Sequence, residues 1–129
     1  MLTIRHKKRP KASGGITYSI SDKTDDYQIL NTDLGSGATF TMFNAGTKTF
    51  TLPTAANMLA HLGFPITFVK KGAGKLIIIG ASGQYIADGS SGGSIYCDIA
   101  GETYASITLM AITTTQFVII GMDGTWSIT

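Results

Sequence analysis

The sequence predicts an all-β fold: an antiparallel β-sandwich of the jelly-roll type, with one short α-helix and an extended basic N-terminal arm. Many short apolar segments alternate with polar residues at a period of two, which is typical of half-buried strands. Turns rich in glycine separate these segments, and the chain has 16 glycines. Charged residues make up only 14% of the 129 residues, against about 25% in most soluble domains. This length fits one domain, which we place at residues 16–129, behind an arm at residues 1–15.

The arm is strongly basic, whereas the rest of the chain is mildly acidic. Residues 1–11 contain five cations and no acid, and the other five lysines and eight acids give residues 12–129 a charge of 5 − 8 = −3. The Ser-Gly-Gly sequence at residues 13–15 indicates a flexible hinge. An extended segment of this kind suits addition of a strand to an exposed sheet edge. We therefore predict a docking arm, whose contacting residues are Leu2, Ile4, Arg5, Lys7, Lys8, Arg9 and Lys11.

The strands follow one another along the rest of the chain. The first is expected at residues 16–20, where Ile16, Tyr18 and Ile20 alternate with hydroxyl residues. The same alternation, or a short apolar run, predicts further strands at residues 27–30, 38–43, 48–52, 66–69, 76–79, 84–87, 94–99, 106–113, 116–121 and 125–128. Gly72 and Gly74 indicate a hairpin between two of them. No segment repeats at a fixed period, which argues against a solenoid or a propeller.

One segment has helical rather than strand periodicity. Thr54 follows a proline and suits the N-cap position. The apolar residues after it fall at i, i+3, i+4 and i+7, which places them on a single stripe. Gly63 and Pro65 end the helix. The stripe, which we expect to pack on a sheet, consists of Ala55, Met58, Leu59 and Leu62.

Two of the predicted strands, residues 76–79 and 117–120, are apolar on both faces. In an antiparallel sheet, one face normally carries polar residues and is exposed to water. Either these strands are central in the sandwich and covered by the helix, or they face another subunit. With the low surface charge, the second alternative predicts a homo-oligomer, most simply a trimer. Its interface residues would be Ile77, Ile79, Val118 and Ile120.

No set of residues predicts catalysis, a metal or a cofactor, so we do not expect an enzyme. The loop before Lys75 departs from the phosphate-binding pattern, because Val69 and Leu76 occupy positions that need glycine and a hydroxyl residue. His61 is the only histidine outside the arm, so no histidine-based metal set can form. Cys97 alternates with isoleucines and is expected to be a buried, inert thiol.

The aromatic side chains offer an alternative to a purely structural role. Tyr85, Tyr96, Tyr104 and Trp126 would suit stacking on a sugar or a base, but they fall on different predicted strands and loops. We therefore favour core or interface roles for them. No apolar run approaches the roughly 18 residues of a membrane span, so no membrane partner is expected. Nucleic acid is an unlikely partner, because the acidic body would repel it.

From about Tyr27 to the C-terminus, the sequence resembles a β-rich structural module of tailed-bacteriophage virion proteins. The resemblance is carried by five segments and covers about four-fifths of the chain. Modules of this kind occur in head decoration proteins and in head or tail fibres, and they are typically sandwich-like and often trimeric. The segments are residues 49–53 (TFTLP), the short helix with Gly63, residues 65–68 with the glycine turn, residues 76–79, and residues 117–121 with 124–126.

The resemblance implies a structural protein of the virion, made in the host cytoplasm. On this reading the protein decorates or cements the capsid. It would associate with itself through the sandwich and dock through its basic arm on the major capsid protein or another virion protein. The alternative is a fibre module that binds a host-surface glycan through residues 85–94 or the C-terminal strands.

Overall fold

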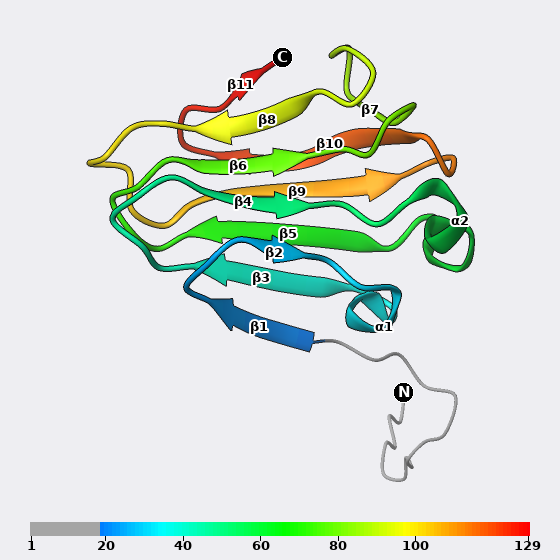
Figure 1. Ribbon diagram of the computed structural model, residues 1–129, viewed down its shortest axis with the longest axis horizontal. Helices are drawn as coiled ribbons and strands as arrows, with labels where there is room; N and C mark the ends of the chain where they lie inside the picture. The colour runs from blue at the N-terminus through cyan, green and yellow to red at the C-terminus, as the bar shows by residue number, and fades with distance from the viewer. Residues whose placement is uncertain (1–18) are drawn as a thin grey trace, which may run out of the picture.

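The computed structural model describes residues 19–129, which fold into two β-sheets packed face to face (Figure 1). The predicted all-β sandwich is confirmed. The six-stranded sheet A has the order β1 (Ser19–Lys23), β3 (Ala38–Met42), β5 (Pro65–Lys70), β9 (Ala105–Ala111), β10 (Gln116–Asp123) and β7 (Tyr85–Ile86). The five-stranded sheet B has the order β11 (Ser127–Ile128), β8 (Ser94–Cys97), β6 (Leu76–Ile79), β4 (Lys48–Thr51) and β2 (Tyr27–Gln28).

The strand pairing differs from a jelly roll. The chain passes from one sheet to the other after almost every strand, so its first six strands form three stacked coils (Figure 1). Within this stack every pair is parallel: β1 with β3, β3 with β5, β2 with β4, and β4 with β6. The pair of β10 with β7 is also parallel. The predicted antiparallel pairing holds only for β5–β9, β9–β10, β6–β8 and β8–β11.

The coils have unequal lengths, which explains why the sequence shows no fixed period. Successive register partners in sheet A are Ser19, Ala38 and Ile66, which are 38 − 19 = 19 and 66 − 38 = 28 residues apart. Those in sheet B are 50 − 27 = 23 and 78 − 50 = 28 residues apart. The argument against a solenoid was therefore wrong for these six strands. The predicted hairpin at Gly72 and Gly74 was also wrong, because this turn joins β5 in sheet A to β6 in sheet B.

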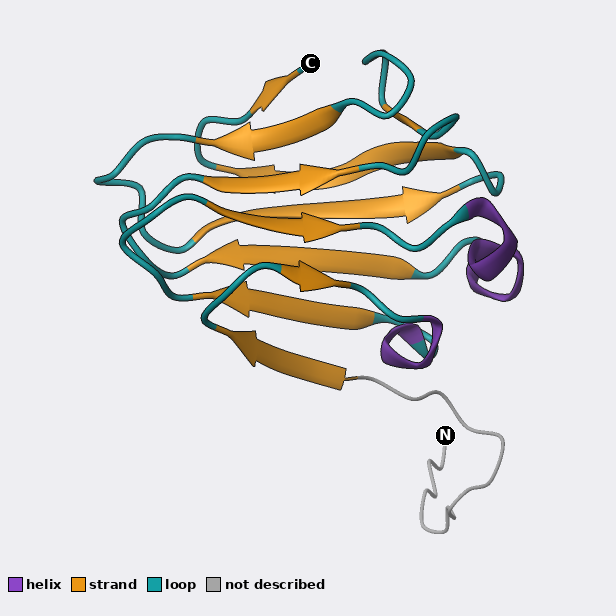
Figure 2. Ribbon diagram, viewed as in Figure 1, coloured by secondary structure: helices purple, strands orange, loops and turns teal. Residues whose placement is uncertain are grey.

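Two short helices lie together at one end of the sandwich (Figure 2). The predicted helix is confirmed as α2 (Ala55–Met58) and a 3-10 turn, η1 (Leu59–His61). Because the helix tightens at Leu59, only Met58 of its apolar stripe is fully buried. The other helix, α1 (Asn31–Leu34), was not predicted. Its first turn is closed by Asp33, whose carboxylate accepts a hydrogen bond from the amide of Leu30 at 2.8 Å.

We call the two ends of the sandwich the helix end and the loop end. The helix end contains α1, α2, η1, the connections at residues 80–84, 87–93 and 112–115, and Thr129. The loop end contains the connections at residues 24–26, 43–47, 71–75, 98–104 and 124–126. This division follows from the strand directions and can be followed in Figure 1.

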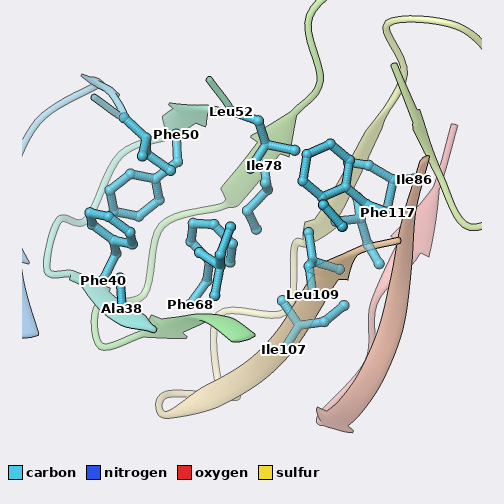
Figure 3. Packing of buried hydrophobic residues seen from close by; sticks show 14 of the residues in the cluster. Ala38, Phe40, Phe50, Leu52, Phe68, Ile78, Ile86, Ile107, Leu109 and Phe117 are labelled. Carbon is cyan, nitrogen blue, oxygen red and sulfur yellow. The ribbon is translucent and has the colours of Figure 1, made fainter. Parts of the chain in front are cut away.

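The core between the sheets is built on a cluster of phenyl rings (Figure 3). Phe40 and Phe68 are register partners in sheet A, and their ring centroids are 5.7 Å apart. Phe50 of sheet B lies 5.6 Å and 5.4 Å from them, so the three rings join the two sheets. Isoleucine and leucine continue the core toward Phe117. Truncation of one of these rings to alanine would cost about 3–5 kcal/mol.

Candidate docking surfaces

The predicted docking arm lies outside the described residues. This holds for Leu2, Ile4, Arg5, Lys7, Lys8, Arg9 and Lys11. The structure does define where the described chain begins. Ser19 starts β1 at the helix end, and its hydroxyl donates a hydrogen bond to the carbonyl of Asp33 in α1 at 3.0 Å. The described chain therefore begins at the helix end.

The four predicted interface residues do not come together. Ile77 and Ile79 are half-buried on the outer face of sheet B, beside Tyr96 and Ser94 of β8. Val118 is half-buried on the opposite outer face, that of sheet A, where its register partner is Met110. Ile120 is 51% exposed and sits at an irregularity between β9 and β10. No single flat contact can cover all four.

Charge is concentrated at the loop end. Among the described residues, all five lysines and six of the eight acids lie there: Lys23, Lys48, Lys70, Lys71, Lys75, Asp22, Asp25, Asp26, Asp98, Glu102 and Asp123. Two ion pairs form within this set, Lys48–Asp25 at 2.9 Å and Lys71–Asp22 at 3.6 Å. A hydrogen bond from Thr41 and the charge of Lys71 lower the pKa of Asp22, and a hydrogen bond from Lys48 lowers that of Asp25.

The loop-end connections of the three coils stack directly on one another. The amide of Gly74 donates to the carbonyl of Asn44 at 3.0 Å, and the side-chain amide of Asn44 donates to the carbonyl of Thr24 at 2.8 Å. The backbones approach so closely that a Cβ on Gly74 would lie 1.9 Å from the carbonyl oxygen of Gly46. Glycine is required at this position because the backbone of another connection in the same chain lies so close, and not because a phosphate binds there.

Lys70 is buried at the loop end, and the sequence analysis missed it. Its side chain is 1% exposed, and its amino group donates to the carbonyls of Gly72 and Ile99 at 2.9 Å and of Glu102 at 3.5 Å. It thereby joins the β5–β6 and β8–β9 connections. The signal was present, since Ile66, Phe68 and Lys70 alternate on the inner face of β5.

Gln84 likewise joins separate connections at the helix end, and the sequence did not lead us to predict this role. Its side chain is fully buried. The amide nitrogen donates to the carbonyl of Pro53 at 2.8 Å and to that of Thr114 at 3.4 Å, and the amide oxygen accepts from Ala81 at 2.7 Å. These bonds join three connections of the helix end.

Cys97 and Glu102 lie next to each other at the loop end. Cys97 is fully buried, as predicted, and its sulfur is 3.6 Å from the Glu102 carboxylate. The same carboxylate accepts hydrogen bonds from the amide of Thr125 at 2.7 Å and from its hydroxyl at 2.9 Å. These bonds lower the pKa of Glu102. The carboxylate thus holds the β10–β11 connection against the β8–β9 connection.

The helix end presents apolar rather than charged side chains. Leu30, Leu59, Phe64 and Ile112 are 51%, 69%, 39% and 50% exposed. Between residues 19 and 129, only Asp33 and Asp88 have charged side chains at this end. His61 joins its two helices, since its ring nitrogens lie within hydrogen-bonding distance of Asn31 Oδ1 and of the Gly35 carbonyl oxygen.

The remaining predicted features do not form a shared site. Tyr85 lies at the helix end, Tyr104 at the loop end, and Tyr96 on the outer face of sheet B, where Lys75 sits 4.2 Å from its ring. Trp126 packs against the core. Within residues 19–129, no cluster of three potential metal ligands occurs and no helix is long and apolar enough to cross a membrane.

Comparisons with protein-family models, curated proteins and solved structures give no match for this chain.

Proposed function

We propose that this protein is a structural component of a tailed-bacteriophage particle that decorates or cements the capsid. In this proposal it associates with itself as a trimer through the β body and docks through the basic segment of residues 1–15 on an acidic surface of the capsid protein. The proposed role is structural and involves no catalysis, cofactor or metal. The protein would be located in the virion.

One observation carries this proposal: a firmly cross-connected body whose described chain begins at the helix end, after a basic segment in the sequence. The stacked loop-end connections, Lys70 and Gln84 join segments that are far apart in the sequence. Such cross-connection suits a part that must keep its shape in a particle. The five cations of residues 1–11 precede Ser19, which lies at the helix end.

Neutralisation of the basic segment tests this function. The full-length variant Arg5→Gln/Lys7→Gln/Lys8→Gln/Arg9→Gln should lose attachment to particles of the phage that encodes the chain. Attachment of the wild type should also weaken with added salt, because surface charges are screened over about 10 Å at 0.1 M. The matched control replaces Lys23, Lys48, Lys71 and Lys75 of the loop end with glutamine. If the control variant loses attachment and the first variant keeps it, docking does not occur through residues 1–15.

A second candidate is a fibre module that binds a host-surface glycan. The observation that favours it is the first coil, whose strands β1 and β2 are edge strands on the same side of the sandwich. Unpaired edges of this kind suit continuation of the coil into a longer fibre. The copy number in purified particles separates the two functions. A decoration protein should approach the abundance of the major capsid protein, whereas a fibre protein should be far rarer.

A further inference from the structure

We propose that the loop end binds the sugar rings of a polysaccharide on two exposed aromatic side chains, Phe43 and Tyr104, with Lys71 between them. This inference rests on the second candidate function, the binding of a host-surface glycan, and assigns its site. The sequence placed glycan binding elsewhere, at residues 85–94 or the C-terminal strands. The fold brings Phe43 and Tyr104 together although 61 residues of sequence separate them, since 104 − 43 = 61.

The three residues lie side by side where sheet A meets the loop end. Phe43 follows β3, Lys71 follows β5 and Tyr104 precedes β9, and these three strands are adjacent in the sheet (Figure 1). The amide of Lys71 donates to the carbonyl of Met42 at 2.8 Å, and that of Tyr104 donates to the carbonyl of Lys70 at 2.5 Å. Because neighbouring strands are about 4.8 Å apart, the backbones of Phe43 and Tyr104 are separated by roughly 10 Å. This separation suits an extended chain of sugar rings.

Phe43 and Tyr104 are the most exposed aromatic residues between residues 19 and 129, at 63% and 65%. An aromatic ring offers a flat face on which the apolar C–H face of a sugar ring can stack. The most exposed apolar residues of the helix end, Leu30, Leu59 and Ile112, are aliphatic and offer no such face. The kind of exposed side chain, rather than the exposed apolar area, therefore favours the loop end for a sugar.

The backbone of Tyr104 is strained. Its φ angle is 68°, a left-handed conformation that a bulky side chain rarely adopts. The turn that holds it is closed by a hydrogen bond from the amide of Glu102 to the carbonyl of Ile99 at 3.0 Å. The ring of Tyr104 is exposed and is not among the side chains packed against the core. Strain of this kind is concentrated at binding sites, so it indicates that this ring contacts a ligand.

Lys71 and Asp22 supply the polar groups of the site. Their side chains form an ion pair at 3.6 Å, and the hydroxyl of Thr41 donates a hydrogen bond to the same carboxylate. Both charged groups are partly open to water, so they can exchange hydrogen bonds with sugar hydroxyls. Because the two charges compensate each other, the ligand does not have to bring a charge of its own. A few polar groups beside an apolar surface are what fixes the orientation of a bound ligand.

The charges around the site favour a sugar over a protein or a nucleic acid. The loop end carries five lysines and six acids, of which only two pairs are joined by salt bridges. A broad protein contact would remove many of these groups from water, which costs free energy. A narrow polysaccharide leaves most of them hydrated, and its hydroxyls can donate to and accept from the rest. A nucleic acid would meet a net charge of 5 − 6 = −1, which repels phosphates.

Removal of each ring tests the proposal. The full-length wild type, Phe43→Ala and Tyr104→Gly are run by affinity electrophoresis through gels containing polysaccharide extracted from the surface of the bacterium that the phage infects. Each variant should bind roughly tenfold more weakly, the loss expected for one stacked aromatic contact. Tyr104→Gly should melt at the same temperature as the wild type or higher, because glycine adopts a positive φ without strain. Tyr85→Ala, which removes an exposed ring at the helix end, is the matched control and should bind like the wild type.

The outcomes separate this inference from the candidate function on which it rests. If the wild type binds the polysaccharide and both loop-end variants bind it equally well, the site is wrong and the glycan function stands. A wild type that does not bind the polysaccharide overturns the site and the glycan function together. If both variants keep wild-type binding but no longer attach to phage particles, the two rings contact a virion protein, which also overturns the inference.

Discussion

At both the loop end and the helix end of the sandwich, a buried polar side chain holds the connections between strands together, but the surrounding residues differ. At each end one buried polar side chain joins separate connections through backbone groups: Lys70 joins two at the loop end, and Gln84 joins three at the helix end. The connections around Lys70 are tight, charged and stacked on one another. Those around Gln84 carry short helices and exposed apolar residues. The loop end is closed by the close approach of backbones, whereas the helix end leaves Leu30, Leu59 and Ile112 at least half exposed.

The largest expected effect comes from the stacked connections of the loop end. In Gly74→Ala the added methyl group would fall 1.9 Å from the carbonyl oxygen of Gly46, so two connections must move apart. We expect a loss of about 3 kcal/mol in the free energy of unfolding, at the upper range for overpacking. Urea denaturation measures it.

Gly101→Ala is the matched control at the same end. A Cβ at Gly101 has no other atom within 4 Å. Its effect on the free energy of unfolding should stay within about 0.5 kcal/mol. Equal effects of the two variants would show that close backbone approach does not define the loop end.

The second prediction compares the two buried side chains directly. Lys70→Met leaves the carbonyls of Gly72 and Ile99 without their donor, and Gln84→Met does the same to Pro53 and Thr114. An unsatisfied buried group costs about 1–3 kcal/mol, so each variant should lose roughly 2–4 kcal/mol by urea denaturation.

Lys75→Met is the control for the lysine, because Lys75 is half-buried and its amino group lies over the Tyr96 ring. It should lose at most about 1 kcal/mol, the value of an exposed cation–π contact. A Lys70→Met variant as stable as the wild type would mean that water or a shifted loop satisfies the carbonyls, and the equivalence of the two ends would fail.

The sequence located the strands better than it located their partners. Every predicted strand has a counterpart, although β1 runs on to Lys23, beyond the predicted end at residue 20. A period of two is the same in parallel and antiparallel strands, so the alternation could not separate a coil from a jelly roll. The turn at Gly72 and Gly74 has the length of a hairpin, yet it crosses between the sheets.

The candidate surface was less accessible to sequence reasoning. The helical stripe predicted Leu59 inside, but the change from α-helix to 3-10 turn rotates it outward. The sequence predicted that Ile77 and Val118 both lie on strands covered on two faces. Only the topology shows that they lie on the outer faces of different sheets, on opposite sides of the sandwich. Lys70 and Gln84 could have been found, since each is a polar residue in phase with buried apolar ones.

The third prediction concerns the link between the helices. His61→Ala removes contacts with Asn31 and Gly35, both of which are exposed to water. Because water replaces them, the loss should be only about 1 kcal/mol. Hydrogen exchange should accelerate in α1 and remain unchanged at the loop end. Asn57→Ala, on the exposed face of α2, is the control. Faster exchange at the loop end after His61→Ala would show that the two ends are not independent.

The smallest expected effect is a local response to pH, with opposite signs at the two ends. Hydrogen bonds from Thr125 lower the pKa of Glu102 at the loop end. A lowered pKa means that the folded state favours the carboxylate, so its contribution is present above the ordinary glutamate pKa of 4.5 and is lost as the pH falls through the lowered value. Near the helix end, a hydrogen bond to Asp33 raises the pKa of Tyr27 above 10.0. That contribution is present below pH 10.0 and is lost as the pH rises through the raised value.

Amide exchange of Thr125 and of Leu30, followed across pH, should therefore separate the ends. Leu30 reports on Asp33, whose carboxylate accepts both its amide and the hydroxyl of Tyr27. After correction for the intrinsic pH dependence of exchange, protection of Thr125 should fall in acid and protection of Leu30 should fall in alkali. Glu102→Gln should remove the acid step at Thr125, and Tyr27→Phe should remove the alkaline step at Leu30. If both amides lose protection together at one pH, the sandwich opens as a whole, and the division into two separately stabilised ends is wrong.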